Sequence, residues 1–246
     1  MLNKYRLKKF ASEFRKTHDI GSSDPIRIKS LLQSLHVLTV FKPIKSSISG
    51  MAVKLDEDYR FILVNSNHSL GRQHFTILHE LYHLYIQPDF QYMVCNTGIF
   101  NKNNLVEYYA DIFAAYTLIP EEGILERIPN NELQKNKISI TTVLDIEQYY
   151  SCSRTALLIR LNEIGLIDKK KLESLKQNIC KTAQMFGYDT TLYKGGNHNL
   201  VIGDYGKKAK FLYDAEIISE SDFMSLMKDI GIDINIDENN PDDKEI

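Results

Sequence analysis

The sequence predicts a fold of the α+β class, with a small sheet placed between groups of helices. Helical periodicity comes first, three short strand-like runs follow, and further amphipathic helices come after them, so helices and strands do not alternate regularly. The 246 residues suffice for one large or two small domains with a sizeable core. With 43 % hydrophobic and 25 % charged residues, the composition is that of an ordinary globular chain.

Two amphipathic helices are predicted at the start of the chain. In the first, apolar residues recur at helical spacing, at Leu7, Phe10, Ala11 and Phe14. For the second, Asp24 and Pro25 are the residue types of an N-cap and a first helical position. Its apolar face is formed by Ile28, Leu31, Leu32 and Leu35.

Three short runs with strand character follow, at 37–41, 50–55 and 60–64. They are bounded by Gly, Ser, Asn and Asp, which favour turns. We expect them to form a small antiparallel sheet beside the next helix. An edge strand of such a sheet can bind an extended peptide by backbone pairing.

The next predicted helix, 71–86, carries the motif His79-Glu80-Leu81-Tyr82-His83. Histidines four apart share one helix face, so both imidazoles can reach one ion. A glutamate directly after the first histidine can hold a water at the open position of that ion, which is the layout of a zinc hydrolase. The alternative is a core helix whose histidines are satisfied by neighbouring groups.

A catalytic zinc site needs a third protein ligand. The best source is the predicted helix 104–119, where Glu107 and Asp111 lie four apart on one face. One carboxylate can bind the metal and the other can accept a hydrogen bond from a ligating histidine. Small alanines on this helix favour close approach to the first one. Glu121 and Glu122 are reserve ligands, although they follow Pro120 and resemble a helix start.

Two stretches, 72–84 and 107–120, resemble the signature of the ImmA/IrrE family of metallo-endopeptidases. The resemblance is strong from about residue 24 to 165 and weaker from 195 to 231. It implies a zincin-like metallopeptidase core holding one Zn²⁺ per chain. Carried over by position, the zinc ligands are His79, His83 and Glu107, and Glu80 is the general base. Asp111 stands where the family often has Asn, next to the ligands, and Tyr82 replaces a common Gly.

The runs 141–150 and 153–164, split at Ser151 and Cys152, resemble a helix-turn-helix. A DNA-reading helix carries several basic or amide residues on its exposed face, and this one offers only Arg154, Arg160 and Asn162. We therefore expect this segment to pack against the catalytic core.

These patterns divide the chain into three predicted units. Residues 1–135 form the metallopeptidase core with its N-terminal helices, and 136–183 form the helical segment. Residues 184–246 form a small accessory α/β region, with a strand at 199–203, a strand or helix start at 210–213, a helix capped near Ser219, and an acidic, disordered tail from Asp233.

Charge and cysteine content restrict the partners and the compartment. The formal net charge is −2, which argues against nucleic acid or an anionic membrane as a partner. No apolar run approaches the ~18 residues that span a bilayer. The three cysteines, Cys95, Cys152 and Cys180, are widely spaced and are expected to be free thiols in a reducing cytoplasm.

The predicted function is that of a cytoplasmic zinc-dependent endopeptidase. Members of the resembled family are paired with helix-turn-helix repressors, so the resemblance implies a specific protein substrate whose cleavage relieves repression. Two alternatives remain: a non-proteolytic, metal-containing regulator that binds a partner protein, and a DNA-binding factor. The residue that stabilises the oxyanion is open among Tyr82, Tyr108, Tyr109 and His74.

Overall fold

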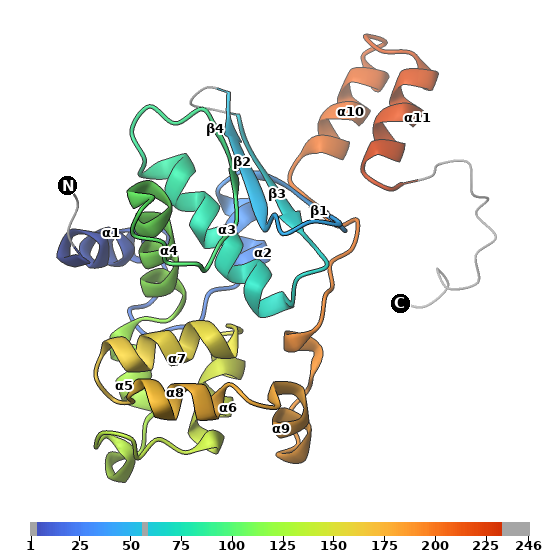
Figure 1. Ribbon diagram of the computed structural model, residues 1–246. Helices are drawn as coiled ribbons and strands as arrows, with labels where there is room; N and C mark the ends of the chain where they lie inside the picture. Colours follow the sequence, from blue (N-terminus) through green and yellow to red (C-terminus); the bar gives the residue numbers. More distant parts are fainter. Residues whose placement is uncertain (1–3, 56–58, 233–246) are drawn as a thin grey trace.

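The computed structural model describes residues 4–55 and 59–232, and the α+β class is confirmed. Within these residues a five-stranded sheet packs against helices (Figure 1). The strands are β1 (Leu38–Lys42), β2 (Gly50–Lys54), β3 (Arg60–Asn65), β4 (Tyr92–Cys95) and β5 (Val201–Ile202). The first helices are α1 (Lys4–Thr17), α2 (Ile28–Ser34), α3 (Leu70–Tyr85), α4 (Leu105–Leu118) and α5 (Glu121–Arg127). The later ones are α6 (Ile140–Tyr149), α7 (Arg154–Glu163), α8 (Lys169–Leu175), α9 (Ile179–Met185), α10 (Tyr205–Asp214) and α11 (Glu220–Asp229).

The sheet is mixed, so the expectation of a purely antiparallel sheet is wrong. Its order is β4-β2-β3-β1-β5, and β3 lies between β1 and β2. The connection 43–49 passes over the end of β3, so β2 runs antiparallel to both neighbours while β1 and β3 run parallel. Local sequence patterns predicted the three strands but carried no information on this non-local order.

The sequence analysis missed one strand, β4, and predicted another, β5, to be longer than it is. β4 lies inside a segment expected to be only a connection, and it becomes a strand by pairing with β2 from Gly50↔Cys95 to Val53↔Tyr92. β5 occupies two residues of the predicted strand 199–203 and pairs with β1. Both lie at the edges of the sheet, where pairing with one neighbour rather than residue pattern defines the strand.

The second helix begins at Ile28, later than the expected start at Asp24 and Pro25. The buried guanidinium of Arg15 explains the difference. Its Nε donates to the carbonyl oxygen of Gly21 at 3.0 Å, and its Nη2 donates to the carbonyl oxygen of Asp24. Because the carbonyl oxygen of Asp24 accepts from Arg15, it does not take part in a helical turn, and the helix begins only at Ile28.

Helices α3 and α4 form the centre of the molecule (Figure 1). α3 lies across the sheet against β2 and β3, and α4 packs along α3. The predicted small face of α4 is buried, since Ala110 and Ala114 have no exposed surface and Ala115 is 1 % exposed. These small side chains let α4 come close enough to present its own polar residues beside those of α3.

The helix pair α6–α7, which resembles a helix-turn-helix in sequence, packs against the rest of the fold. Ser153 caps α7 by accepting a hydrogen bond from the N–H of Ala156. Arg154 and Arg160, two of the three candidate DNA-contacting residues, are 1 % and 2 % exposed. Arg154 pairs with the buried carboxylate of Glu147, and Arg160 lies over the ring of Tyr116.

After α9 the chain returns to the sheet through β5 and then forms the hairpin of α10 and α11, which lies beyond β1 in Figure 1. Residues 210–213, left open as strand or helix, lie in α10, and Ser219 forms a capping box with Asp222 at the start of α11. The predicted tail from Asp233 lies outside the described residues, and the three domain boundaries stay a prediction. In the described part of the chain, no helix combines the length and apolarity needed to cross a bilayer.

Candidate metal centre

Three predicted residues from two helices meet at one point. The Nε2 atoms of His79 and His83, on successive turns of α3, lie 3.2 Å apart. Glu107, in the first turn of α4, places one carboxylate oxygen 3.4 Å from His79 Nε2 and the other 3.2 Å from His83 Nε2. Both histidines are fully buried. Asn104 caps α4 by accepting from the N–H of Glu107, which fixes where that side chain begins.

The spacing of these three side chains fits a metal ion. Zinc bonds of about 2.0–2.2 Å to nitrogen and oxygen place two ligands of a tetrahedral site about 3.3–3.5 Å apart. The observed separation of 3.4 Å lies in this range, and the two of 3.2 Å lie just below it. The donor set of two imidazoles and a carboxylate is also one that zinc accepts.

The second ring nitrogen of each histidine is engaged, which directs Nε2 at the cluster. Nδ1 of His79 donates to Oδ1 of Asp111 at 2.9 Å, and Nδ1 of His83 donates to Oε1 of Gln87 at 2.6 Å. Asp111 is held in turn by the backbone N–H groups of Gly98 and Phe100, at 2.8 and 2.7 Å. Such outer partners fix the tautomer and orientation of a ligating imidazole.

Glu80 lies beside the cluster and is fully buried. Its Oε1 has no hydrogen-bond partner among the described residues. A buried carboxylate oxygen without a partner is costly, and it marks a place for a water or another polar group. Gly50 on β2 makes room for it, because a Cβ at Gly50 would lie 2.8 Å from Oε1.

The charges of the site favour a cation between the ligands. Burial lowers the pKa of His79, but hydrogen bonds to Asp111 and Glu107 outweigh it and raise that pKa to about 10. Burial raises the pKa of Glu107, but the two histidines outweigh it and lower that pKa to about 2. Burial is the main cause that raises the pKa of Glu80 to about 8. Carboxylates around buried imidazoles thus stabilise positive charge here, as protons or as a metal ion.

Two residues at the cluster were missed from the sequence as site residues. Cys95, at the end of β4, places Sγ 3.7 Å from His83 Nε2 and 3.7 Å from Glu107 Oε1. It completes a group of four possible ligand atoms that all lie within 4.8 Å of one another. Burial and the carboxylates of Glu80 and Glu107 raise the pKa of its thiol. Gln87, four residues after His83, had a helical spacing that could have revealed it, whereas nothing in the pattern placed Cys95 here.

The remaining sequence candidates are placed as follows. Glu121, a reserve ligand, pairs with Lys8 at 2.9 Å. His74 binds the carbonyl oxygen of Ser151 through Nδ1, and the buried ring of Tyr82 packs edge-on against His83. The hydroxyl of Tyr109 is buried without a hydrogen-bond partner in the described structure.

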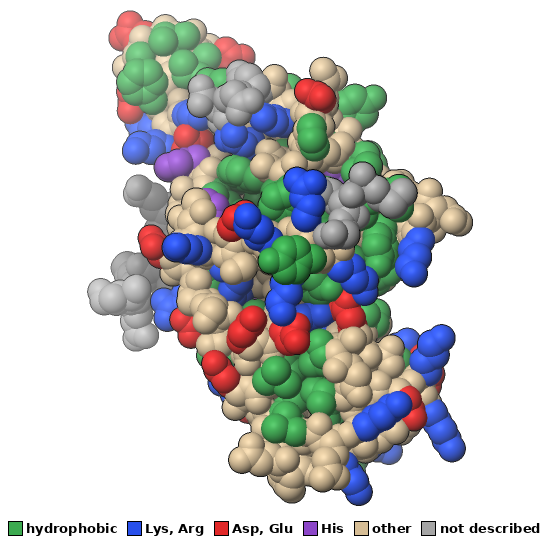
Figure 2. All heavy atoms as spheres, turned by 90° about the vertical axis from the view of Figure 1, so that its left-hand side faces the viewer, with side chains coloured by type: hydrophobic (Ala, Val, Ile, Leu, Met, Phe, Trp, Pro, Cys, Tyr) green, Lys and Arg blue, Asp and Glu red, His purple; other side chains and the backbone are tan. Residues whose placement is uncertain are grey.

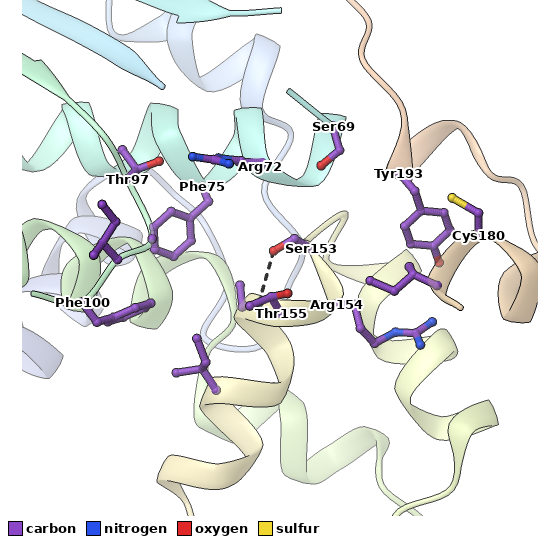
Figure 3. A pocket seen from close by; sticks show the side chains of 15 residues that line it. Ser69, Arg72, Phe75, Thr97, Phe100, Ser153, Arg154, Thr155, Cys180 and Tyr193 are labelled. Atoms are coloured by element: carbon purple, nitrogen blue, oxygen red, sulfur yellow. Dashed lines mark hydrogen bonds between the residues drawn. The ribbon is translucent and has the colours of Figure 1, made fainter. Parts of the chain in front are cut away.

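A cavity of about 500 Å³ lies between α3, the loop 97–100 and α7 (Figure 3). Thr97 and Phe100, which line it, belong to the loop that donates to Asp111. Arg72 and Phe75 of α3 also line it, with the ring of Phe75 near that of Phe100, and Tyr193 lies at its far end in the view of Figure 3. The cavity is largely apolar and lies next to the metal cluster along α3.

A comparison with known families agrees with this geometry. Residues 32–162, which include both helices of the site, match the Peptidase M78 family, described as the IrrE N-terminal-like domain. The chain belongs to this family. The resemblance to the ImmA/IrrE family is therefore confirmed, and M78 membership indicates a metallopeptidase. No curated protein matches the chain in sequence.

Proposed function

We propose that this M78 peptidase is a zinc-dependent endopeptidase with one Zn²⁺ per chain, held by His79, His83 and Glu107. The observation that carries the proposal is the meeting of these side chains at metal-ligand spacing beside the buried Glu80. A zinc ion in this position lowers the pKa of a bound water to about 7 and polarises a carbonyl group.

The protein's own residues supply the proton transfers. Glu80 acts as general base on the attacking water and then delivers the proton to the leaving amine. Burial is the main cause that raises the pKa of Glu80, which makes its carboxylate a stronger base than an exposed one. Asp111 and Gln87 hold the two imidazoles in the orientation that turns Nε2 to the ligand cluster.

A substrate chain can be positioned by β4. This strand lies at the edge of the sheet, and the N–H of Lys54 on β2 donates to the carbonyl oxygen of Gln91. Because backbone groups alternate between the two edges of a strand, those of Tyr92 and Val94 face the open edge. We propose that an extended peptide pairs there, next to Cys95 and the metal cluster.

We propose that the substrate is one specific protein, a helix-turn-helix repressor, and that the enzyme acts in the cytoplasm. The proposal of this substrate rests on the resemblance to the ImmA/IrrE family, whose members are paired with helix-turn-helix repressors. It predicts weak activity on generic substrates, so robust digestion of casein by the purified protein contradicts it. On the face drawn in Figure 2, basic and acidic side chains are interspersed, which suits a protein partner better than nucleic acid.

The test compares the wild type with Glu80→Gln, each co-expressed with the helix-turn-helix repressor encoded nearest to its gene. We expect the wild type to cut the repressor, and the variant to leave it intact while keeping its metal. Identical effects of both proteins on the repressor would favour the second candidate, a non-proteolytic regulator that acts by binding. Loss of metal from Glu80→Gln would place Glu80 among the ligands instead.

A further inference from the structure

Cys95 occupies the place where the proposed mechanism needs a water. It ends the edge strand β4 and is 1 % exposed. Its Sγ lies 3.5 Å from Glu80 Oε2, the general base, as well as 3.7 Å from His83 Nε2 and from Glu107 Oε1. A hydrolytic water has to touch the same groups, namely the metal ligands on one side and the base on the other.

The distances fit sulfur as a fourth ligand. A zinc–sulfur bond of about 2.3 Å combined with bonds of about 2.0–2.2 Å to nitrogen or oxygen gives tetrahedral separations of about 3.5–3.7 Å. Both measured distances from Sγ to His83 and Glu107 are 3.7 Å, and its distance to the ligand atom of His79 is within 4.8 Å. Two of the three separations from sulfur therefore match those of a tetrahedral site with sulfur at one corner.

A second observation indicates that the Cys95 sulfur and a hydrolytic water compete for the position beside Glu80. Oε1 of Glu80 is buried with no partner in the described structure, while its Oε2 accepts from the Cys95 thiol. The carboxylate is thus only half satisfied when sulfur is its neighbour. A water in place of the thiol can serve the base, whereas a metal-bound thiolate has no proton to give it.

We propose that Cys95 binds the metal as a fourth protein ligand and closes the site in most molecules, so that only the fraction whose sulfur has left the metal is active. Ligation replaces the thiol proton, which goes to solvent, with a metal–sulfur bond, and no electron is transferred. Zinc sites with four protein ligands are closed, and catalysis needs one position open. The inference rests on the proposed function, because it concerns the same metal.

The first test measures metal–sulfur bonding without any substrate. The purified full-length protein is loaded with Co²⁺, and its near-ultraviolet spectrum is recorded for a thiolate-to-cobalt charge-transfer band. We expect the band in the wild type and in Cys180→Ser, whose cysteine is exposed, and its loss in Cys95→Ala. X-ray absorption of the zinc form should show one sulfur at about 2.3 Å.

The outcomes separate the two proposals. Bound cobalt without the sulfur band overturns the role of Cys95 and leaves the peptidase proposal standing. Failure of the wild type to bind cobalt or zinc overturns both. Absence of the band from the cobalt-loaded wild type overturns the role of Cys95 whether or not Cys95→Ala folds.

The second test measures whether the fourth position is open, using acetohydroxamate as a metal-binding probe of the cobalt form. Its apparent affinity is reduced by the fraction of sites that are open, so a wild type open in about a tenth of molecules binds about tenfold more weakly than Cys95→Ala. We expect the wild type and Cys180→Ser to bind acetohydroxamate at least tenfold more weakly than Cys95→Ala does. Equal affinities in wild type and Cys95→Ala would overturn latency.

Discussion

Gln87 shows how a residue outside the motif can set the properties of the metal site. Its Oε1 accepts the hydrogen bond of His83 Nδ1 at 2.6 Å. Substitutions of such outer partners typically cost 10–100-fold in metal affinity. We expect Gln87→Ala to weaken zinc binding by about that factor, and Gln87→Glu, which keeps an acceptor oxygen, to retain most of it. The measurement is competition with a chromophoric chelator, and Gln91→Ala, in an exposed residue of the same connection, is the control.

Gly50 is predicted to be required for the position of Glu80. A Cβ there would lie 2.8 Å from Glu80 Oε1 and 2.7 Å from a methyl carbon of Thr76. We expect Gly50→Ala to displace the general base and to reduce repressor cleavage while zinc stays bound. Gly206→Ala, where the nearest atom is 3.6 Å away, should leave both unchanged. Full cleavage activity in Gly50→Ala would show that the base tolerates the shift.

At the scale of residues, the sequence predicted those site residues that are spaced along a single helix. His79, Glu80 and His83 follow from the motif, and Glu107 and Asp111 follow from i, i+4 spacing together with the family resemblance. Cys95 could not be predicted, because its approach to the ligands depends on the pairing of β4 with β2. That pairing joins residues 39 to 45 positions apart and leaves no local pattern.

At the scale of elements, the open edge of β4 is predicted to hold the substrate. Val94 is 51 % exposed, and its N–H faces away from β2, so Val94→Pro removes one outward donor without breaking the β2–β4 ladder. One hydrogen bond contributes about 1 kcal/mol, so we expect kcat/KM for repressor cleavage to fall about fivefold. Val94→Thr keeps the N–H and is the control. An unchanged kcat/KM in Val94→Pro would place the substrate elsewhere.

The stability contributed by the contacts of Glu163, which connect α7 to α1 and α4, is predicted to depend on pH. Burial raises the pKa of Glu163, but hydrogen bonds from Lys4 and Tyr116 and the charge of Arg160 outweigh it and lower that pKa. A lowered pKa means that the stabilisation is present above the unfolded value of about 4.3 and is lost as the pH falls through the folded value. We therefore expect Glu163→Gln to lower Tm at pH 7 and to lower it less below pH ~4. A Tm difference that is independent of pH would contradict this.

Elements were predicted where a local pattern defines them. The helices that carry the site were found within a residue or two, because their apolar stripes and caps are local. The start of α2 was wrong, since the distant Arg15 binds the carbonyl groups that a longer helix would have used. The strand order was equally inaccessible, because it depends on how β3 enters between β1 and β2.

At the scale of the whole molecule, the metal site joins the parts of the fold. α3 carries two of the proposed ligands and the proposed base, α4 carries Glu107, and β4 carries Cys95. A ligand that binds only the folded state stabilises it by about 2.7 kcal/mol at a free concentration of 100 Kd. Zinc is therefore expected to raise Tm in the wild type, and much less in His83→Ala, as measured by thermal unfolding with and without added zinc. An equal shift in both proteins would place the bound zinc at another site.

The central claim is that His79, His83 and Glu107 form a resident zinc site, and elemental analysis of the purified, tag-free protein tests it most directly. The account predicts about one zinc per chain in the wild type and in Glu80→Gln, and a strongly reduced content in His79→Ala and His83→Ala. A wild-type protein that holds no metal after zinc addition and buffer exchange would contradict the account.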